Sequence, residues 1–295
     1  MDKASKFRHL LATTDIIVIP GTFNAIIAKI IEKTGFEAVY CSGAAICNSL
    51  LGLPDIGLMS LPEITKVAEY VNHAIDIPVI SDADTGFGNS INVMRTVWEF
   101  EKIGVAGIHI EDQIFPKRCG HVAGKELISS DEMVGKIKAA VTARKNRDFV
   151  IIARSDAKAM EGMEGLICRG KKYRDAGADV IFPEALENLE EFNAFARSVE
   201  DVYLMANMTE FGKTDYISVG DFKKVGFKIV IFPTSTMRIA LKSIESFLIE
   251  LKEKGTQKDC LDRMQTRREL YDLLGYDKYT EWEKNFLVKG GIEPL

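Results

Sequence analysis

Four segments of this chain repeat one junction, in which a charged helical turn ends at a glycine and an apolar run follows. The segments are Glu32–Gly35, Glu101–Gly104, Arg174–Gly177 and Lys223–Gly226. A glycine directly after a helix adopts the left-handed conformation that stops the helix, and the chain then turns into a strand. The repeat therefore predicts helices alternating with strands, the pattern of a parallel sheet covered by helices.

Apolar runs of strand length occur eight times along the chain. They cover Ile16–Pro20, Ala38–Cys41, Pro78–Ser81, Gly107–Ile110, Phe149–Ala153, Val180–Pro183, Val202–Ala206 and Ile229–Phe232. Segments with helical periodicity separate them. Eight such units predict an α/β fold, a (β/α)8 barrel of the TIM type. We expect residues 1–255 to form this barrel as the catalytic domain and residues 256–295 to form a C-terminal helical extension.

The extension carries apolar residues that need a surface to cover. Within Asp259–Leu274, residues at helical spacing are Leu261, Met264, Leu270, Leu273 and Leu274. An amphipathic helix buries such a stripe against another part of the protein. Two surfaces fit equally well, namely the chain's own barrel and a partner subunit.

Charge and cysteine content exclude several classes of function. The 38 basic and 43 acidic residues give a formal net charge of −5, which is not the basic footprint of a nucleic-acid-binding protein. An acidic chain gains no attraction to an anionic membrane, and no stretch reaches the roughly 18 apolar residues of a membrane helix. The 5 cysteines are scattered without a C-x-x-C pair, and we expect Cys41 and Cys168 to be core thiols. The sequence thus predicts a cytoplasmic protein without nucleic-acid or membrane partners.

Polar residues follow seven of the eight predicted strands. They are Ser42 and Gly43, Asp82 and Asp84, Glu111 and Asp112, Arg154 and Asp156, Glu184, Asn207 and Glu210, and Ser235 and Arg238. The carboxyl ends of the strands form the active-site face of a barrel. We therefore expect these side chains to meet at one mouth, although each alone could be an ordinary capping or loop residue.

The densest acidic cluster belongs to the third and fourth strands. Asp82 and Asp84 stand two residues apart, and Glu111 follows the next strand. Carboxylate oxygens without histidine or cysteine suit Mg²⁺, which keeps several waters and takes its other ligands from carboxylates and substrate oxygens. The alternative is that the two aspartates cap the helix that begins near Asn89.

A cysteine with cationic neighbours lies between the fourth strand and the next helix, in the string Lys117-Arg118-Cys119-Gly120-His121. Neighbouring positive charge favours a thiolate, so we expect Cys119 to act as an acid or a nucleophile. Lys117 and His121 complete this candidate catalytic group.

Two common barrel chemistries are disfavoured. A Schiff-base aldolase needs a lysine at a strand end, and no predicted strand ends in one. Phosphate-binding barrels usually place glycines after the seventh and eighth strands, where this chain has N-M-T-E-F-G and P-T-S-T-M-R. Arg154, Arg238 and Arg267 can instead bind carboxylates bidentately. The sequence therefore favours metal-assisted chemistry on a small-molecule carboxylate substrate.

Seven strings together resemble one family. K-R-C-G-H stands with D-A-D-T-G-F-G, H-I-E-D-Q, A-R-S-D-A, F-P-E-A, A-N-M-T-E-F-G and M-Q-T-R-R-E-L-Y. Over nearly the whole chain they resemble the isocitrate lyase and phosphoenolpyruvate mutase superfamily. The cysteine string is specific for the lyase branch of that superfamily.

The resemblance implies Mg²⁺-dependent cleavage of the C2–C3 bond of 2-methylisocitrate to pyruvate and succinate, a step of propionate catabolism in the methylcitrate cycle. Asp82 and Asp84 match the family's metal-site aspartates, and Cys119 matches the catalytic cysteine that protonates the succinate carbanion. Substrate-binding positions match at Ser42, Gly43, Ala44, Gly120, Arg154, Glu184, Asn207, Thr209, Arg238 and Arg267. The family often has a glycine where Ala44 stands. A homotetramer with C-terminal helices swapped between subunits is also implied.

The base that takes the hydroxyl proton is less well defined. Tyr40, at a strand end, is a candidate, and a core aromatic residue is the equal alternative. A 2,3-dimethylmalate lyase, which grips two carboxylates rather than three, and an isocitrate lyase are alternative activities. Arg238 and the run Thr209–Phe211 favour the tricarboxylate. A catalytically silent barrel that serves as a binding subunit has no reason to keep Asp82, Asp84 and Cys119 together.

Overall fold

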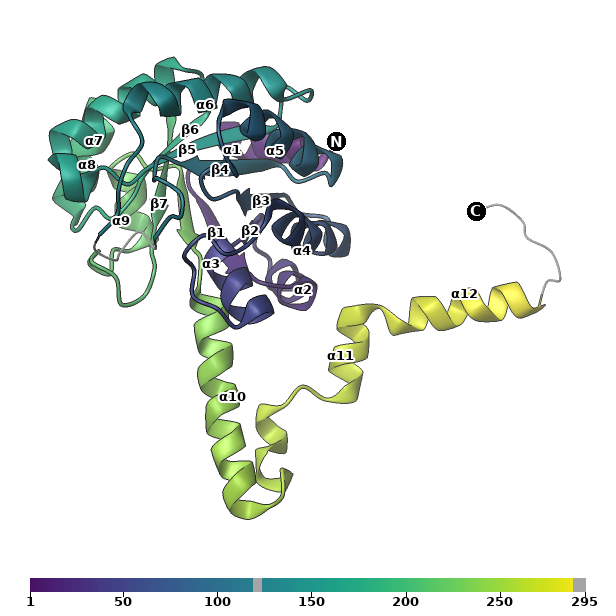
Figure 1. Ribbon diagram of the computed structural model, residues 1–295. Helices are drawn as coiled ribbons and strands as arrows, with labels where there is room; N and C mark the ends of the chain where they lie inside the picture. The colour runs from purple at the N-terminus through teal and green to yellow at the C-terminus, as the bar shows by residue number, and fades with distance from the viewer. Residues whose placement is uncertain (119–123, 289–295) are drawn as a thin grey trace. The chain divides into compact units, whose positions relative to one another are not determined.

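The computed structural model describes residues 1–118 and 124–288. Eight parallel strands form one closed barrel in chain order. They are β1 (Ile17–Thr22), β2 (Val39–Cys41), β3 (Val79–Asp82), β4 (Gly107–Glu111), β5 (Val150–Ser155), β6 (Val180–Pro183), β7 (Tyr203–Asn207) and β8 (Ile229–Phe232). Each strand overlaps its predicted run, so the predicted TIM-type barrel is confirmed (Figure 1).

Helices alternate with the strands, and those from α2 to α9 lie around the barrel (Figure 1). They are α2 (Ala25–Lys33), α3 (Gly43–Ile46), α4 (Leu61–Ala74), α5 (Ser90–Lys102), α6 (Ser130–Ala143), α7 (Lys158–Asp175), α8 (Leu189–Ser198), α9 (Val219–Lys224) and α10 (Ser235–Lys254). A π-helical turn, Cys47–Leu51, continues α3. The four junction glycines behave as predicted, because Gly35, Gly104, Gly177 and Gly226 have φ angles of 94°, 78°, 101° and 93°.

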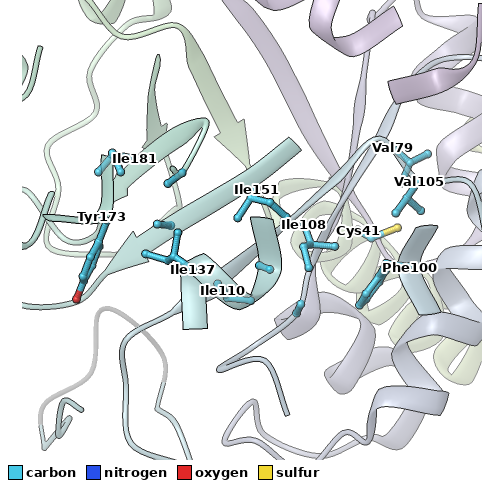
Figure 2. Packing of buried hydrophobic residues seen from close by; sticks show 14 of the residues in the cluster. Cys41, Val79, Phe100, Val105, Ile108, Ile110, Ile137, Ile151, Tyr173 and Ile181 are labelled. Carbon is cyan, nitrogen blue, oxygen red and sulfur yellow. The ribbon is translucent and has the colours of Figure 1, made fainter. Parts of the chain in front are cut away.

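The core has two apolar layers. The outer layer joins strand residues such as Ile108 and Ile151 to helix residues such as Phe100 and Tyr173 (Figure 2). The inner layer fills the barrel, and it includes Phe7 and Leu11 of an N-terminal helix, α1 (Lys3–Thr13). These two side chains pack with residues at the beginnings of strands, so α1 closes the end of the barrel opposite the mouth.

The cysteine expectations are half right. Cys41 is buried in β2, as predicted. Cys168 is exposed, so its assignment to the core is wrong. It lies on α7, whose buried residues include Leu166, Arg169 and Tyr173, and the face that carries Cys168 points to solvent.

The chain divides into two compact units, Met1–Arg238 and Ile239–Leu295. The second unit contains the rest of α10, a 3-10 turn (Lys258–Arg263), α11 (Arg267–Leu274) and α12 (Tyr276–Val288). The predicted stripe over Asp259–Leu274 is broken, because Thr266 caps the start of α11 reciprocally with Glu269. None of the helices in the described ranges has the length and apolarity needed to cross a membrane.

Candidate active site

A cavity of about 880 Å³ opens at the carboxyl ends of the strands. Its walls include ten of the residues singled out from the sequence, namely Tyr40, Ser42, Ala44, Asp82, Lys117, Arg154, Glu184, Asn207, Thr209 and Arg238. Pro54, Asp55 and Ile56 line it from the loop before α4. The prediction that polar residues at the strand ends converge on one mouth is confirmed for those of them that line the cavity, namely Ser42, Asp82, Arg154, Glu184, Asn207, Glu210 and Arg238.

Asp82 and Asp84 lie in a loop with an unusual backbone. Asp84 and Phe87 have φ angles of 46° and 58°, and Gly86 and Gly88 are also in the positive-φ region. The N–H of Asp84 donates to Asp82 Oδ1 at 2.9 Å. Asn89, rather than either aspartate, caps α5, so the capping alternative is wrong.

Gly43 makes room for the Asp82 carboxylate. A Cβ atom at residue 43 would lie 2.5 Å from Asp82 Oδ2, a distance that side chains do not tolerate. Ser42 caps α3 by accepting a hydrogen bond from the Ala45 N–H at 3.3 Å. The loop after β2 therefore needs glycine because it passes directly against a carboxylate of the acidic cluster.

A buried lysine balances the acidic cluster. Lys117 Nζ lies 2.7 Å from Asp55 Oδ2 and 2.9 Å from Asp84 Oδ1. The contact with Asp84 has ion-pair distance, and Asp84 Oδ1 accepts no well-directed hydrogen bond from the described residues. Burial alone would lower the pKa of Lys117, but Asp84, Glu111 and Asp55 outweigh it and raise that pKa.

Burial affects the three carboxyl groups of this cluster differently. It raises the pKa of Glu111 well above its usual value, against Arg154 and Lys117, and raises that of Asp84 to about 6. The pKa of Asp82 is lowered, because His109 and Lys117 outweigh the effect of burial. Lys117 and Arg154 therefore do not fully offset the effect of burial on Asp84 and Glu111.

The donor set fits Mg²⁺. Among the residues that the structure describes, buried Glu111 Oε1 has no hydrogen-bond partner, and Asp84 Oδ1 has only the ion-pair contact with Lys117. In the described residues no three acidic, histidine or cysteine side chains come close enough to hold a metal ion by themselves. A small number of direct carboxylate ligands, with water completing the shell, is how Mg²⁺ is commonly bound. Asp82, Asp84 and Glu111 are the residues that could hold it.

Tyr40 lies beside this cluster. Its hydroxyl is 2.6 Å from His109 Nε2, and it donates to Asp82 Oδ2 at 3.4 Å. His109 is fully buried and its Nε2 lies 3.3 Å from Asp82 Oδ1. Burial and the charge of Asp82 raise the pKa of Tyr40 well above its usual value. Tyr40 is thus a core aromatic residue, as one alternative had it, whose hydroxyl is hydrogen-bonded and which also lines the cavity.

Arg154 lies at the centre of three carboxylates. Its Nε is 2.9 Å from Asp156 Oδ2 and 3.2 Å from Glu111 Oε2, and its Nη1 is 3.5 Å from Glu184 Oε2. Asn207 donates from Nδ2 to Glu184 Oε1 at 3.2 Å and leaves its own Oδ1 without a partner. These side chains form a charged wall on which a substrate carboxylate can bind.

The opposite wall, formed after β7 and β8, is more open. The Arg238 side chain is 46% exposed, its Nε donates to Thr234 Oγ1 at 3.1 Å, and it lies 3.5 Å from Glu210 Oε2. Its guanidinium also lies over the Phe211 ring, 5.6 Å from the centroid. Phe211 is 84% exposed with a φ of 58°. We call Thr209–Phe211 with Arg238 the outer wall.

Seven predicted residues are not among those that line the cavity. Three of them lie just behind its walls: Gly43 and Asp84 beside Asp82, and Glu111 beside Arg154. Cys119, Gly120 and His121 lie outside the described residues. Arg267 begins α11 in the second compact unit. Sequence reasoning missed Asp55, because nothing in a turn-rich loop indicates a pairing with a lysine 62 residues later.

Comparisons with known proteins identify the family. The family model described as phosphoenolpyruvate phosphomutase matches residues 7–252. A curated 2-methylisocitrate lyase from Aeropyrum pernix is 55% identical over 92% of this chain and 87% of its own length. A 2,3-dimethylmalate lyase from Eubacterium barkeri is 44% identical, over 97% of this chain and 99% of its own. The chain belongs to the phosphoenolpyruvate mutase/isocitrate lyase family, as the sequence strings predicted, and is an enzyme with carbon–carbon lyases among its relatives.

Solved structures agree with this assignment. A crystal structure of a 2,3-dimethylmalate lyase matches with a TM-score of 0.91 and 35% identity, over 100% of this chain and 99% of that chain. A phosphonopyruvate hydrolase in complex with oxalate and Mg²⁺ matches with a TM-score of 0.89 and 28% identity, over 97% of this chain and 100% of that chain. The barrel fold is thus shared with both of these proteins.

Proposed function

We propose that this protein cleaves 2-methylisocitrate to pyruvate and succinate with the help of Mg²⁺. The observation that carries the proposal is one cavity lined by Asp82, a member of the buried acidic cluster, and by two separate arginines, Arg154 and Arg238. The 55% identity to a 2-methylisocitrate lyase supports this substrate over 2,3-dimethylmalate, whose lyase is 44% identical. Isocitrate stays the other alternative.

Asp82, Asp84 and Glu111 would hold the cation. Mg²⁺, when bound, stabilises negative charge on the hydroxyl and carboxylate oxygens of the substrate as a Lewis acid. The phosphonopyruvate hydrolase structure with Mg²⁺ supports this choice of metal. Ser42, Gly43 and Ala44 would bind the part of the substrate that becomes pyruvate, because they lie against Asp82.

The proton movements are assigned to three residues. Tyr40 would pass its own proton to His109 Nε2, 2.6 Å away, as it accepts the hydroxyl proton of the substrate. The bond between C2 and C3 then breaks, leaving a ketone on one fragment and a carbanion on the other. Cys119, with Lys117 and His121 near it in the chain, would donate the thiol proton to the carbanion and form succinate.

The test is an assay of pyruvate release from 2-methylisocitrate, isocitrate and 2,3-dimethylmalate side by side. We expect the highest kcat/KM with 2-methylisocitrate and no release in excess chelator. A higher kcat/KM with 2,3-dimethylmalate would overturn the substrate assignment. Asp131→Ala, at a carboxylate that is 87% exposed, is the control for nonspecific effects of substitution.

The proposal extends to assembly and setting. We propose a barrel domain over residues 1–255 and a helical extension over residues 256–295 that swaps between subunits of a homotetramer, acting in the cytoplasm in propionate catabolism. Exposed apolar side chains on the extension support it, among them Leu261, Tyr279 and Phe286. Deleting residues from Gly255 onward should give smaller species in light scattering, and an unchanged size would contradict the swap.

A further inference from the structure

Lys125 is a buried lysine that the proposed reaction does not use. Its side chain is 3% exposed, and its Nζ lies 2.8 Å from Asp156 Oδ1. The backbone around it is fixed, because the Ile114 N–H donates to the Glu126 carbonyl at 2.8 Å and the Ile128 N–H donates to the Asp112 carbonyl at 3.0 Å. These bonds tie the segment after β4 to the strand that carries Glu111.

Asp156 is shared between Lys125 and Arg154. Arg154 donates to both Asp156 oxygens, from Nε to Oδ2 at 2.9 Å and from Nη2 to Oδ1 at 3.1 Å. Oδ1 thus receives a lysine and an arginine at once. Arg154 lines the cavity, whereas Asp156 and Lys125 do not contribute to its described walls.

Asp112 holds Asp156 in place through the Asp156 backbone. The Asp156 N–H donates to Asp112 Oδ1 at 2.9 Å. The other Asp112 oxygen accepts bonds from Ser155 Oγ and Tyr173 Oη, each at 2.7 Å, and from Arg169 Nη1 at 3.2 Å. Asp112 is fully buried. The position of the Asp156 carboxylate is therefore set by the core of the barrel, not by the loop.

The charge balance gives Lys125 a role. Arg154 forms ion pairs with Asp156, Glu111 and Glu184, so three carboxyl groups interact with its single positive charge. Pairing with Lys125 offsets the charge of Asp156 and leaves the charge of Arg154 for a ligand. A buried ion pair contributes little to stability compared with apolar packing, so stability alone does not account for this one.

We propose that Lys125 is a positioning residue, which shares Asp156 with Arg154 and thereby holds the Arg154 guanidinium in the orientation that binds a substrate carboxylate. This inference rests on the proposed function, in which Arg154 grips the substrate. It concerns a residue outside the cavity walls.

The first test is Lys125→Met, assayed with 2-methylisocitrate. We expect kcat/KM to fall about tenfold to hundredfold, mainly through a higher KM, because Arg154 holds a carboxylate that cleavage does not change. Lys125→Arg should restore kcat/KM to within about threefold of the wild type, since it keeps the charge. Lys158→Met removes a lysine that pairs with Glu191 at 2.7 Å outside the cavity, and it should leave KM unchanged. A merely structural role for Lys125 would lower kcat through loss of active protein and leave KM as it is.

The second test is the same substitution in an Arg154→Lys background. If Lys125 acts through Arg154, Lys125→Met should change KM there by less than about twofold. An equal effect of Lys125→Met in both backgrounds would overturn the inference. Thermal unfolding is followed for every variant, and Lys125→Gln replaces Lys125→Met if the latter does not fold. A wild-type chain that cleaves none of the three acids would overturn the proposed function, whereas a cleaving wild type with an unchanged Lys125→Met overturns only the role of Lys125.

Discussion

The two sides of the cavity differ in how deeply their charges are buried. Asp82, Asp84 and Glu111 are 5%, 4% and 1% exposed, whereas the side chain of Arg238 in the outer wall is 46% exposed. Electrostatic interactions are stronger between buried charges than between charges near water. Substitution of a buried charged residue is therefore expected to have the larger effect. The difference teaches that the acidic cluster suits the chemical step and the outer wall suits the choice of substrate.

The largest expected effect comes from a substitution in the acidic cluster that removes the proposed metal site. Asp84→Ala should lower kcat/KM about 10⁴-fold on every substrate, because a metal ion contributes several kcal/mol of charge stabilisation. Activity should no longer respond to Mg²⁺ concentration. Asp131→Ala serves as the matched surface control. Full activity of Asp84→Ala in excess chelator would show that the acidic cluster does not hold a metal.

A somewhat smaller effect is expected at the cysteine. Cys119→Ser should lower kcat about 10³-fold while substrate binding is nearly unchanged, because a hydroxyl is a far weaker acid than a thiol. Cys168→Ser, at an exposed thiol on α7, is the control. The measurement is single-turnover cleavage together with binding of 2-methylisocitrate. Near-normal turnover of Cys119→Ser would exclude the proposed acid.

The smallest effect concerns stability against pH. Burial raises the pKa of Asp84 from 3.8 to about 6, so the metal-free fold binds this proton more tightly than the unfolded chain does. The free energy of unfolding should therefore fall by about 1 to 3 kcal/mol as pH rises from about 4 to about 6. Asp82, whose pKa is lowered, contributes below this window.

Asp84→Asn is the variant that isolates this effect. It cannot ionise, so the part of the pH slope that Asp84 causes should disappear in urea unfolding with chelator present. Mg²⁺ should restore stability to the wild type at pH 7, because it favours the ionised carboxylate. An identical slope in the wild type and the variant would mean that Asp84 is not the group that titrates.

The repeated pattern of the sequence predicts the barrel well. A continuous apolar run marks every strand, and a junction glycine precedes four of them. These local signals agree with the fold, so the prediction succeeds. The helix α1 has no such signal and was missed, since Phe7 and Leu11 are buried only by the closed barrel. The break before α11 was readable, because Thr266 and Glu269 form a capping box.

The candidate site is predicted less completely. Strand-end positions indicate which side chains face the mouth, but not their partners. Lys117 pairs with Asp55 and Lys125 with Asp156 across 62 and 31 residues, and no sequence spacing encodes such contacts. Tyr40 lies on β2 and His109 on β4, and both strands pair with β3. The contact between the two side chains therefore depends on the sheet and not on their spacing in the sequence.

The most direct test of the difference between the two sides is Arg238→Gln, assayed on 2-methylisocitrate and 2,3-dimethylmalate. If Arg238 holds a carboxylate that dialkylmalates lack, kcat/KM should fall about tenfold to hundredfold for 2-methylisocitrate and change little for 2,3-dimethylmalate. Asp84→Ala should lower both equally. Equal losses on both substrates in Arg238→Gln would contradict the account, because the outer wall would then grip a group that the two substrates share.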